Sequence, residues 1–172
     1  GRNILNKFQR SFYSRPKKAA TRLNSRLIAA TPSISNSIKT LWGRDSDIIP
    51  EVGKDPSLIN LTNRRDINCP LIIVWSGLHK PGKNLPLLLD SLNLLNINFE
   101  LHILGAGEMT NKWIKKSNKL GLNNKCIWHG WVEHSNSINI MKKGHLLCIT
   151  SISDLTSTVT IEALTCGLPI IC

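Results

Sequence analysis

Residues 71–104 read LIIVWSGLHKPGKNLPLLLDSLNLLNINFELHIL, and this stretch decides the fold. Two short apolar runs, at 71–76 and 99–104, are typical of buried strands. Between them, a loop with Gly, Pro and Lys leads into an apolar segment at about 84–95, which predicts a helix. A strand, a helix and a second strand in this order predict a parallel pair joined by a right-handed crossover.

The same alternation continues toward the end of the sequence. Further strands are expected at about 126–129, 145–150 and 168–172, and further helices at about 109–120, 136–143 and 157–166. Short apolar strands that alternate with helices predict an α/β fold, in which a parallel sheet is covered by helices on both faces. Such sheets bind ligands beyond the carboxyl ends of their strands, so we expect the functional residues in the loops that follow strands.

Before this region the pattern is less regular. A short strand is expected at 27–30, followed by a helix that begins after Thr31 and ends before Gly43. Residues 43–69 are polar and rich in turn formers, which is typical of a hinge or linker. Residues 1–26 predict a basic helical stretch.

The net charge of +11 is unevenly distributed, because residues 1–50 hold ten Lys and Arg against two Asp, whereas residues 51–172 hold twelve against nine acidic residues. Such asymmetry can indicate contact with nucleic acid or an anionic membrane. We favour the alternative of a solvated helix face, and keep a peripheral contact with an anionic membrane open. No nucleic-acid partner is expected, since the aromatic residues are not interleaved with the basic ones. No run of eighteen apolar residues predicts a membrane-spanning helix.

The five cysteines are an odd number, and four of them lie in apolar strand or helix contexts. This pattern favours buried thiols in a reducing compartment over disulfides. The expected location is therefore the cytoplasm.

Two pairs of residues have the spacing of metal ligands: Cys126 with His129, and His145 with Cys148. Both pairs fall on expected strands, where residues i and i+3 point to opposite faces and cannot chelate one ion together. We therefore expect no metal site and no cofactor. Three further histidines are expected to pack in the core or lie on the surface rather than act in catalysis: His79, His102 and His134.

The loop at 76–84 holds Gly77, Gly82 and Lys83 directly before a helix. Glycines, a flexible ammonium group and the N–H groups of a helix N-terminus form a plausible cradle for a diphosphate. The spacing is not that of a Walker A motif, and taken alone it is more typical of an ordinary turn with exposed lysines. In the next loop, at 105–107, the glycines are expected to let the chain turn sharply into the following helix.

The most informative motif is SDLTSTVTIEALTCGLPIIC at 153–172, which places Asp154 and Glu162 eight residues apart across a loop that enters a helix. Thr156, Ser157 and Thr158 supply helix-capping hydroxyls. The N-terminus of this helix presents N–H groups and a positive dipole end that suit a phosphate. Two acceptors on either side of a phosphate could hold hydroxyls at both ends of a nucleotide-sugar.

The spacing of Asp154 and Glu162, followed by ALTCGLP at 163–169, resembles the acidic signature of retaining glycosyltransferase family 4, the group 1 glycosyl transferases. Those enzymes usually carry glutamate at both ends, so Asp154 departs by one methylene. The resemblance covers about residues 31–172. It implies the GT-B architecture, in which two Rossmann-like domains enclose the active site in a cleft.

The resemblance also implies a division of the chain and an activity. Residues 1–47 would be the tail of an N-terminal, acceptor-side domain with the interdomain segment, and residues 48–172 the nucleotide-sugar (donor) binding domain, truncated at its C-terminus. The activity would be retaining, metal-independent transfer of a hexosyl group from a nucleotide-sugar donor to a glycan, lipid-linked or other acceptor. The chain is expected to be a fragment of a longer enzyme that is inactive by itself, in the cytoplasm or peripheral at the inner membrane face.

Individual roles follow from the same resemblance. Glu162 would hold the ribose hydroxyls and Asp154 the donor sugar hydroxyls, while Lys83 and the N–H groups at the start of the helix would stabilise the departing diphosphate. The base would lie against the loop of Trp131 and Val132, for which aromatic core packing is an equal alternative. The expected catalytic residues are Asp154, Glu162 and Lys83; the expected substrate-binding residues are Gly77, Lys83, Trp131, Val132, Asp154, Thr156, Ser157, Thr158, Val159 and Glu162.

Leu78 stands where the resembled family has an arginine that clamps the donor diphosphate. The bidentate fork of that arginine is missing here. Together with Asp154, this departure suggests an alternative function, a non-catalytic nucleotide-sugar-binding module or partner subunit with a degenerate donor site.

Overall fold

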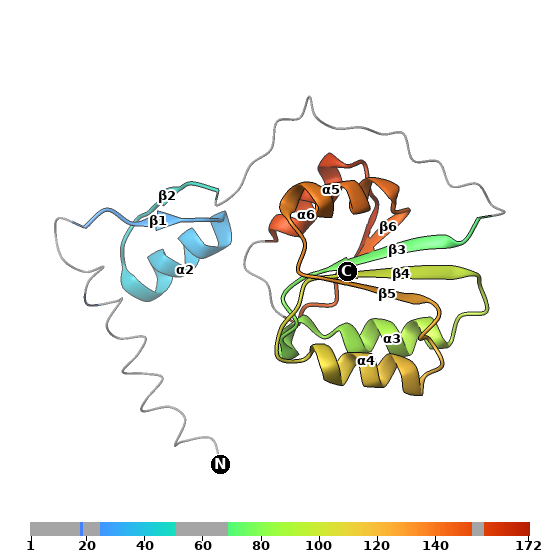
Figure 1. Ribbon diagram of the computed structural model, residues 1–172. Coiled ribbons are helices and arrows are strands. Elements are labelled where there is room, and N and C mark those ends of the chain that lie inside the picture. Colours follow the sequence, from blue (N-terminus) through green and yellow to red (C-terminus); the bar gives the residue numbers. More distant parts are fainter. Residues whose placement is uncertain (1–17, 19–24, 51–68, 153–156) are drawn as a thin grey trace, which may run out of the picture. The chain divides into compact units, whose positions relative to one another are not determined.

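A computed structural model describes residues 18, 25–50, 69–152 and 157–172. The chain divides into two compact units, residues 1–53 and residues 54–172, here called the N-terminal unit and the C-terminal unit. Each unit is described by itself (Figure 1).

The N-terminal unit contains two short strands and one helix: β1 (Ile28–Ala29), α2 (Pro32–Trp42) and β2 (Asp47–Ile48). The hydroxyl of Thr31 accepts a hydrogen bond of 3.2 Å from the N–H of Ile34, which caps the start of α2. Gly43 ends the helix in the left-handed conformation, with φ of 68°. The predicted strand and helix of this region are therefore confirmed.

Strand β2 was not predicted, because it lies in the polar stretch that the sequence indicates as a hinge or linker. It forms by pairing in parallel with β1, with Asp47 opposite Ile28. A hydrogen bond of 2.7 Å from the Arg26 guanidinium to the Asp47 carboxylate lies beside this pair. Strand β2 thus depends on pairing with residues 19 positions earlier in the sequence, and the local composition does not indicate it. The remainder of the predicted linker, residues 51–68, and most of the basic stretch 1–26 lie outside the described residues.

The C-terminal unit is built on a five-stranded, all-parallel sheet in the order β5-β4-β3-β6-β7. Helices connect the strands, and a 3₁₀ turn, η2, precedes the first helix. The predicted α/β fold with a parallel, Rossmann-like sheet is confirmed. The elements are β3 (Leu71–Ser76), η2 (Pro81–Lys83), α3 (Leu85–Asn93), β4 (Phe99–Leu104), α4 (Thr110–Lys119), β5 (Cys126–Gly130), α5 (His134–Lys143), β6 (Leu146–Cys148), α6 (Thr158–Thr165) and β7 (Ile170–Ile171).

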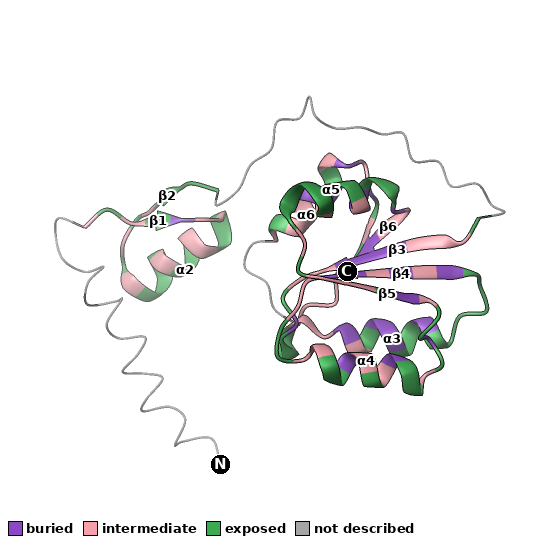
Figure 2. Cartoon of the chain, in the orientation of Figure 1, coloured by how far each residue is buried: buried purple, intermediate pink, exposed green. Residues whose placement is uncertain are grey.

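Helices α3 and α4 cover one face of this sheet, and α5 and α6 cover the other (Figure 1). Because side chains alternate between the two faces along a strand, one strand can supply side chains to the hydrophobic core on each face of the sheet. Phe99, Leu101 and Ile103 of β4 are buried in the core under α3 and α4. Leu104 joins a second core with Met141 of α5 on the opposite face. Figure 2 shows buried residues along the strands of the sheet and on α3.

Several element boundaries differ from the prediction. Strand β6 covers three residues instead of 145–150, and β7 covers two instead of 168–172. The sheet pairing explains both, since β6 and β7 share only two residue pairs at one end of the sheet. Helix α5 begins at His134, two residues earlier than expected, because Glu133 is already in the extended conformation of a capping residue.

The cysteines follow the prediction in part. Cys126, Cys148 and Cys166 are buried, whereas Cys69 and Cys172 are exposed. Burial raises the pKa of the Cys126 thiol and of the Cys148 thiol to about 11.

None of the helices in the described residues is long and apolar enough to cross a membrane.

Candidate functional site

The order of the strands creates a topological switch point between β3 and β6. The chain moves outward from β3 to β4 and β5, and then returns to place β6 on the other side of β3. The loop after β3 leads to α3 on one face, and the segment after β6 leads to α6 on the other (Figure 1). Open α/β sheets bind ligands in the crevice at such a point.

Three hydrogen bonds connect the segment after β6 to β3 and to the loop that follows β3. The Thr150 hydroxyl donates to the carbonyl of Lys83 at 2.8 Å and accepts at 3.0 Å from the indole N–H of Trp75. The N–H of Ile152 donates to the carbonyl of Gly82 at 2.9 Å. The backbone at Gly82 and Lys83 is therefore fixed against residues 150–152, which follow β6.

Gly77 and Lys83, both predicted to bind substrate, lie close together in the loop after β3. A Cβ atom placed on Gly77 would lie 3.7 Å from Cδ of Lys83, so the lysine stem passes directly over the glycine. Lys83 ends η2, and Asn84 then takes a left-handed conformation with φ of 48° that starts α3. Leu78, in the same loop, is 40% exposed.

The glycines after β4 allow this loop to pack closely against the loop after β3. A Cβ atom on Gly105 would overlap the carbonyl oxygen of Gly77, and one on Gly107 would lie only 2.7 Å from the carbonyl oxygen of His79. Gly105 also has a φ of 104°. The role expected from the sequence, a sharp turn into α4, is thus only part of what these glycines do.

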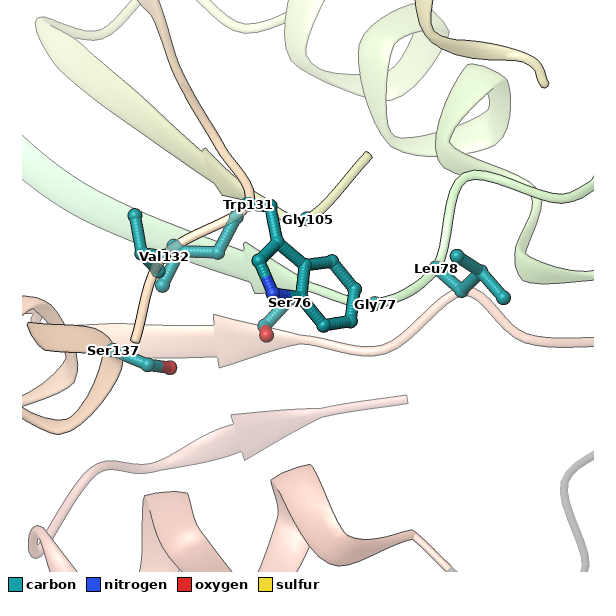
Figure 3. A pocket seen from close by; sticks show the side chains of 8 residues that line it. Ser76, Gly77, Leu78, Gly105, Trp131, Val132 and Ser137 are labelled. Atoms are coloured by element: carbon teal, nitrogen blue, oxygen red, sulfur yellow. The ribbon is translucent and has the colours of Figure 1, made fainter. Parts of the chain in front are cut away.

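A pocket of about 240 Å³ opens at the carboxyl ends of β3, β4 and β5. Figure 3 shows the indole of Trp131 lying across this pocket between Val132 and Leu78. Trp131 is 79% exposed, which corrects the alternative of aromatic core packing for this residue. Val132, in contrast, is partly buried and packs against the core beneath α5 and α6. The pocket is lined by Ser76, Gly77, Leu78, Leu104, Gly105, Trp131, Val132 and Ser137.

Helix α6 begins as the sequence predicts, with Ser157 as its capping residue. The Ser157 hydroxyl accepts a hydrogen bond of 3.3 Å from the N–H of Thr160. Thr158 and Val159 are the first two helical residues, whose N–H groups have no acceptor within a helix. The start of α6 therefore combines N–H donors with the positive end of the helix dipole.

Glu162 lies within α6 and is 8% exposed. Its Oε1 lies 2.8 Å from Nε2 of His134, the first residue of α5. His134 lies on the surface, as expected, but it also contacts a residue that the sequence assigns to the site. Sequence reasoning did not indicate this contact, because the two residues are 28 positions apart and on different helices.

Of the two alternatives expected for the histidine after β3, packing in the core or a place on the surface, the structure shows core packing. His79 is 1% exposed, and its ring lies 5.0 to 5.9 Å from those of three tryptophans, Trp75, Trp113 and Trp128. Its Nδ1 lies 2.8 Å from the hydroxyl of Thr110. Burial lowers the pKa of His79, because a charged imidazole loses its hydration there.

His102 and His129 form a stacked pair on neighbouring strands, with 3.0 Å between Nδ1 of His102 and Nε2 of His129. Burial and the neighbouring His102 lower the pKa of His129. Within the described residues, no group of three or more His, Cys, Asp or Glu side chains is arranged to hold a metal ion.

The predicted site residues fall into two groups in the structure. Gly77, Trp131 and Val132 line the pocket, and Lys83 passes over Gly77. Glu162 and the residues at the start of α6 are not in the pocket lining. Asp154 and Thr156 lie outside the described residues. Sequence reasoning missed His134 and the pocket hydroxyls of Ser76 and Ser137, although Ser76 ends a predicted strand, which is a position where ligand contacts are expected.

The solved structures compared below have the same fold, and each is longer than this chain. The lipopolysaccharide outer core galactosyltransferase WaaB is 22% identical with a TM-score of 0.71, over 84% of this chain and 42% of WaaB. Anabaena HepE in complex with UDP is 19% identical with a TM-score of 0.80, over 98% of this chain and 50% of HepE. A mutant of S. aureus TarM is 18% identical with a TM-score of 0.78, over 93% of this chain and 32% of TarM. At these identities the likeness is one of fold, and the chain spans half or less of each protein's length.

Comparison with curated protein sequences gave no match. The family model of the group 1 glycosyl transferases, in contrast, matches residues 64–172, which is more than half of the chain. That range holds the complete parallel sheet, the pocket at its carboxyl edge and α6 with Glu162. The chain therefore belongs to the group 1 glycosyl transferase family.

Proposed function

We propose that the protein is a retaining glycosyltransferase of family 4, which transfers a hexosyl group from a nucleotide-sugar to a glycan or lipid-linked acceptor. Residues 48–172 would be its donor-binding domain, and residues 1–47 would belong to the acceptor side. The observation that carries the proposal is the hydrogen-bonded junction at the switch point, where Lys83 is fixed against the segment that leads into α6.

The diphosphate of the donor would lie between Lys83 and the start of α6. An ammonium group and the N–H groups of Thr158 and Val159 are donors suited to phosphate oxygens. In the transfer, the bond between the anomeric carbon and the diphosphate oxygen breaks, and the oxygen of the acceptor hydroxyl forms a new bond to that carbon on the same face of the sugar. The proton of the acceptor hydroxyl would pass to the departing diphosphate oxygen. Negative charge develops on the departing diphosphate, and these donors would stabilise it without a required metal ion.

The rest of the donor would extend to both sides of this diphosphate. The nucleobase would occupy the pocket beside Trp131 and Val132, where an exposed indole offers a flat face for stacking. Glu162 would accept hydrogen bonds from the ribose hydroxyls, and Asp154 from the hydroxyls of the donor sugar. HepE was solved with UDP-glucose and with UDP, which supports uridine nucleotides as the first donors to test.

Glu162→Gln in the intact protein tests this proposal. The amide keeps the shape of the side chain but loses charge-assisted hydrogen bonding, so UDP should bind about 1.5–3 kcal/mol more weakly. Isothermal titration calorimetry measures the difference, and Thr165→Ser on the same helix is the matched control. Equal affinities of wild type and Glu162→Gln would contradict the ribose assignment.

A second candidate function is a non-catalytic nucleotide-sugar-binding subunit. Leu78 favours it, because an apolar side chain lines the pocket where the family has an arginine. The two functions differ in turnover. The intact protein incubated with a nucleotide-sugar and EDTA should release nucleoside diphosphate and transfer sugar if it is the enzyme, and should bind the donor without consuming it if it is the subunit.

The cellular location is part of the same proposal. A cytoplasmic enzyme has access to nucleotide-sugars, and the basic residues of 1–50 are the candidates for a peripheral contact with anionic lipids. Cosedimentation with vesicles that contain phosphatidylglycerol, compared with phosphatidylcholine vesicles, measures this contact.

A further inference from the structure

The contact between His134 and Glu162 connects the two helices on one face of the sheet. His134 opens α5, and Glu162 lies in the middle of α6. The exposed fractions of their side chains differ strongly, at 60% for His134 and 10% for Glu162. The histidine is therefore the solvent-facing member of the pair, and the carboxylate is the enclosed one.

The chemistry of the two groups decides the direction of the hydrogen bond. A carboxylate only accepts hydrogen bonds, so Nε2 of His134 carries the proton and donates it to Oε1 of Glu162. A carboxylate offers about four acceptor positions on its two oxygens. The contact uses one of them and leaves Oε2 able to accept from a further donor.

His134 also belongs to the segment that forms the wall of the pocket. Val132 precedes it and Ser137 follows it, and both line the pocket. A hydrogen bond from this segment to Glu162 fixes the carboxylate relative to the pocket wall. Without that bond, Glu162 would retain more rotamer freedom, which binding of a ligand would have to remove.

We propose that His134 is a positioning residue for the nucleotide, which orients the Glu162 carboxylate toward the ribose diol. The inference rests on the proposed function, because it takes Glu162 as the ribose-binding residue. The enclosed position of Glu162 separates this contact from an ordinary surface ion pair, since an enclosed carboxylate needs a donor. Among the described residues that donor is His134.

Four variants of the intact protein test the inference by calorimetric titration. His134→Ala removes the donor, whereas His134→Gln keeps an N–H donor at a reach similar to that of Nε2. Asn136→Ala changes an exposed residue of the same helix and is the matched control. Glu162→Gln reports on the ribose contact itself. The probes are UDP and 2′,3′-dideoxy-UDP, which lacks both ribose hydroxyls. Wild type is also titrated with ADP and GDP.

His134→Ala should bind UDP about three- to tenfold more weakly, the range of one hydrogen bond. Its affinity for the dideoxy nucleotide should stay within about twofold of wild type, because that ligand makes no use of the oriented carboxylate. His134→Gln should restore most of the affinity for UDP, and Asn136→Ala should leave it unchanged. A loosened fold would instead weaken both nucleotides together.

The outcomes separate the inference from the proposed function. If Glu162→Gln weakens UDP but His134→Ala does not, or if His134→Ala weakens both nucleotides equally, the positioning role is wrong and the ribose site stands. If Glu162→Gln leaves UDP binding unchanged, or if wild type binds none of UDP, ADP and GDP, the proposed ribose site is overturned and the inference with it.

Discussion

Leu78 stands where the resemblance to family 4 implies an arginine. It lies at the wall of the pocket and is 40% exposed, in the loop that also holds Gly77 and Lys83. An aliphatic side chain cannot form hydrogen bonds with phosphate oxygens. Lys83 is then the predicted cation of this loop, and a single ammonium group acts as a point charge rather than a bidentate fork.

Leu78→Arg should therefore strengthen the binding of a nucleoside diphosphate and leave that of the nucleoside nearly unchanged. The new guanidinium can form paired hydrogen bonds with phosphate oxygens, which the nucleoside lacks. Calorimetric titration of UDP and uridine measures both, with Leu78→Met as an uncharged control. A parallel gain in affinity for uridine would show that the substituted side chain faces the base instead.

Lys83→Ala should weaken the binding of UDP, and this loss of affinity should shrink at high salt.

His79 gives the fold a dependence on pH. Burial lowers its pKa in the folded state below the ordinary value of 6.5, so the folded protein favours the neutral ring. The contribution of the neutral His79 ring to the free energy of unfolding is fully present above about pH 6.5. It is lost as the pH falls toward the lower pKa of His79 in the folded state. Urea unfolding between pH 5 and 8 should show stability decreasing below about pH 6.5. His79→Asn should flatten that slope, whereas His129→Asn should remove only the part that is due to its own lowered pKa.

The loops after β3 and β4 pack closely against each other, because glycines let their backbones approach. Gly105→Ala adds a Cβ atom that overlaps the Gly77 carbonyl, whereas a Cβ atom on Gly121 meets nothing within 4 Å. Both glycines have positive φ, which costs alanine about 1–2 kcal/mol in the left-handed region of Gly121, with φ of 71°, and at least as much at Gly105, with φ of 104°. Gly105→Ala should cost a further 1–3 kcal/mol or so from the overlap, measured by urea unfolding. Equal losses of stability would mean that the two loops separate easily.

The elements that local chemistry specifies were the ones that the sequence predicted well. Strands β3 and β4 have the predicted bounds because each is a short apolar run with turn formers around it, and α2 follows from its capping residues. Strand β2 and the contact of His134 with Glu162 depend on partners distant in the sequence, which no local pattern indicates. The packing of the helices also decides that Gly77 lines the pocket whereas Glu162, on α6, does not. The spacing of the motifs indicated Gly77, Lys83 and Glu162 as site residues, but it could not indicate which of them line the same pocket.

The whole chain spans half the length of HepE and less of the other two structures described above. The proposed enzyme closes two domains around a donor, and the C-terminal unit described here would provide the donor side. We therefore expect the 172-residue chain by itself to bind a nucleoside diphosphate and to transfer no sugar. Titration with UDP and a radiolabelled transfer assay on the same preparation measure the two properties. Turnover of a nucleotide-sugar with an acceptor by this chain alone would contradict the two-domain mechanism.

The exposure of Trp131 has a spectroscopic consequence. Of the five tryptophans in the chain, it is the one that stands largely in water, whereas Trp75 and Trp113 are buried. Its fluorescence should therefore emit at longer wavelength and should be the component that a soluble quencher such as iodide removes first. A nucleobase stacked on the indole would shield it from iodide and quench it directly. The protein thus carries its own optical reporter, at the wall of the pocket where the donor is proposed to bind.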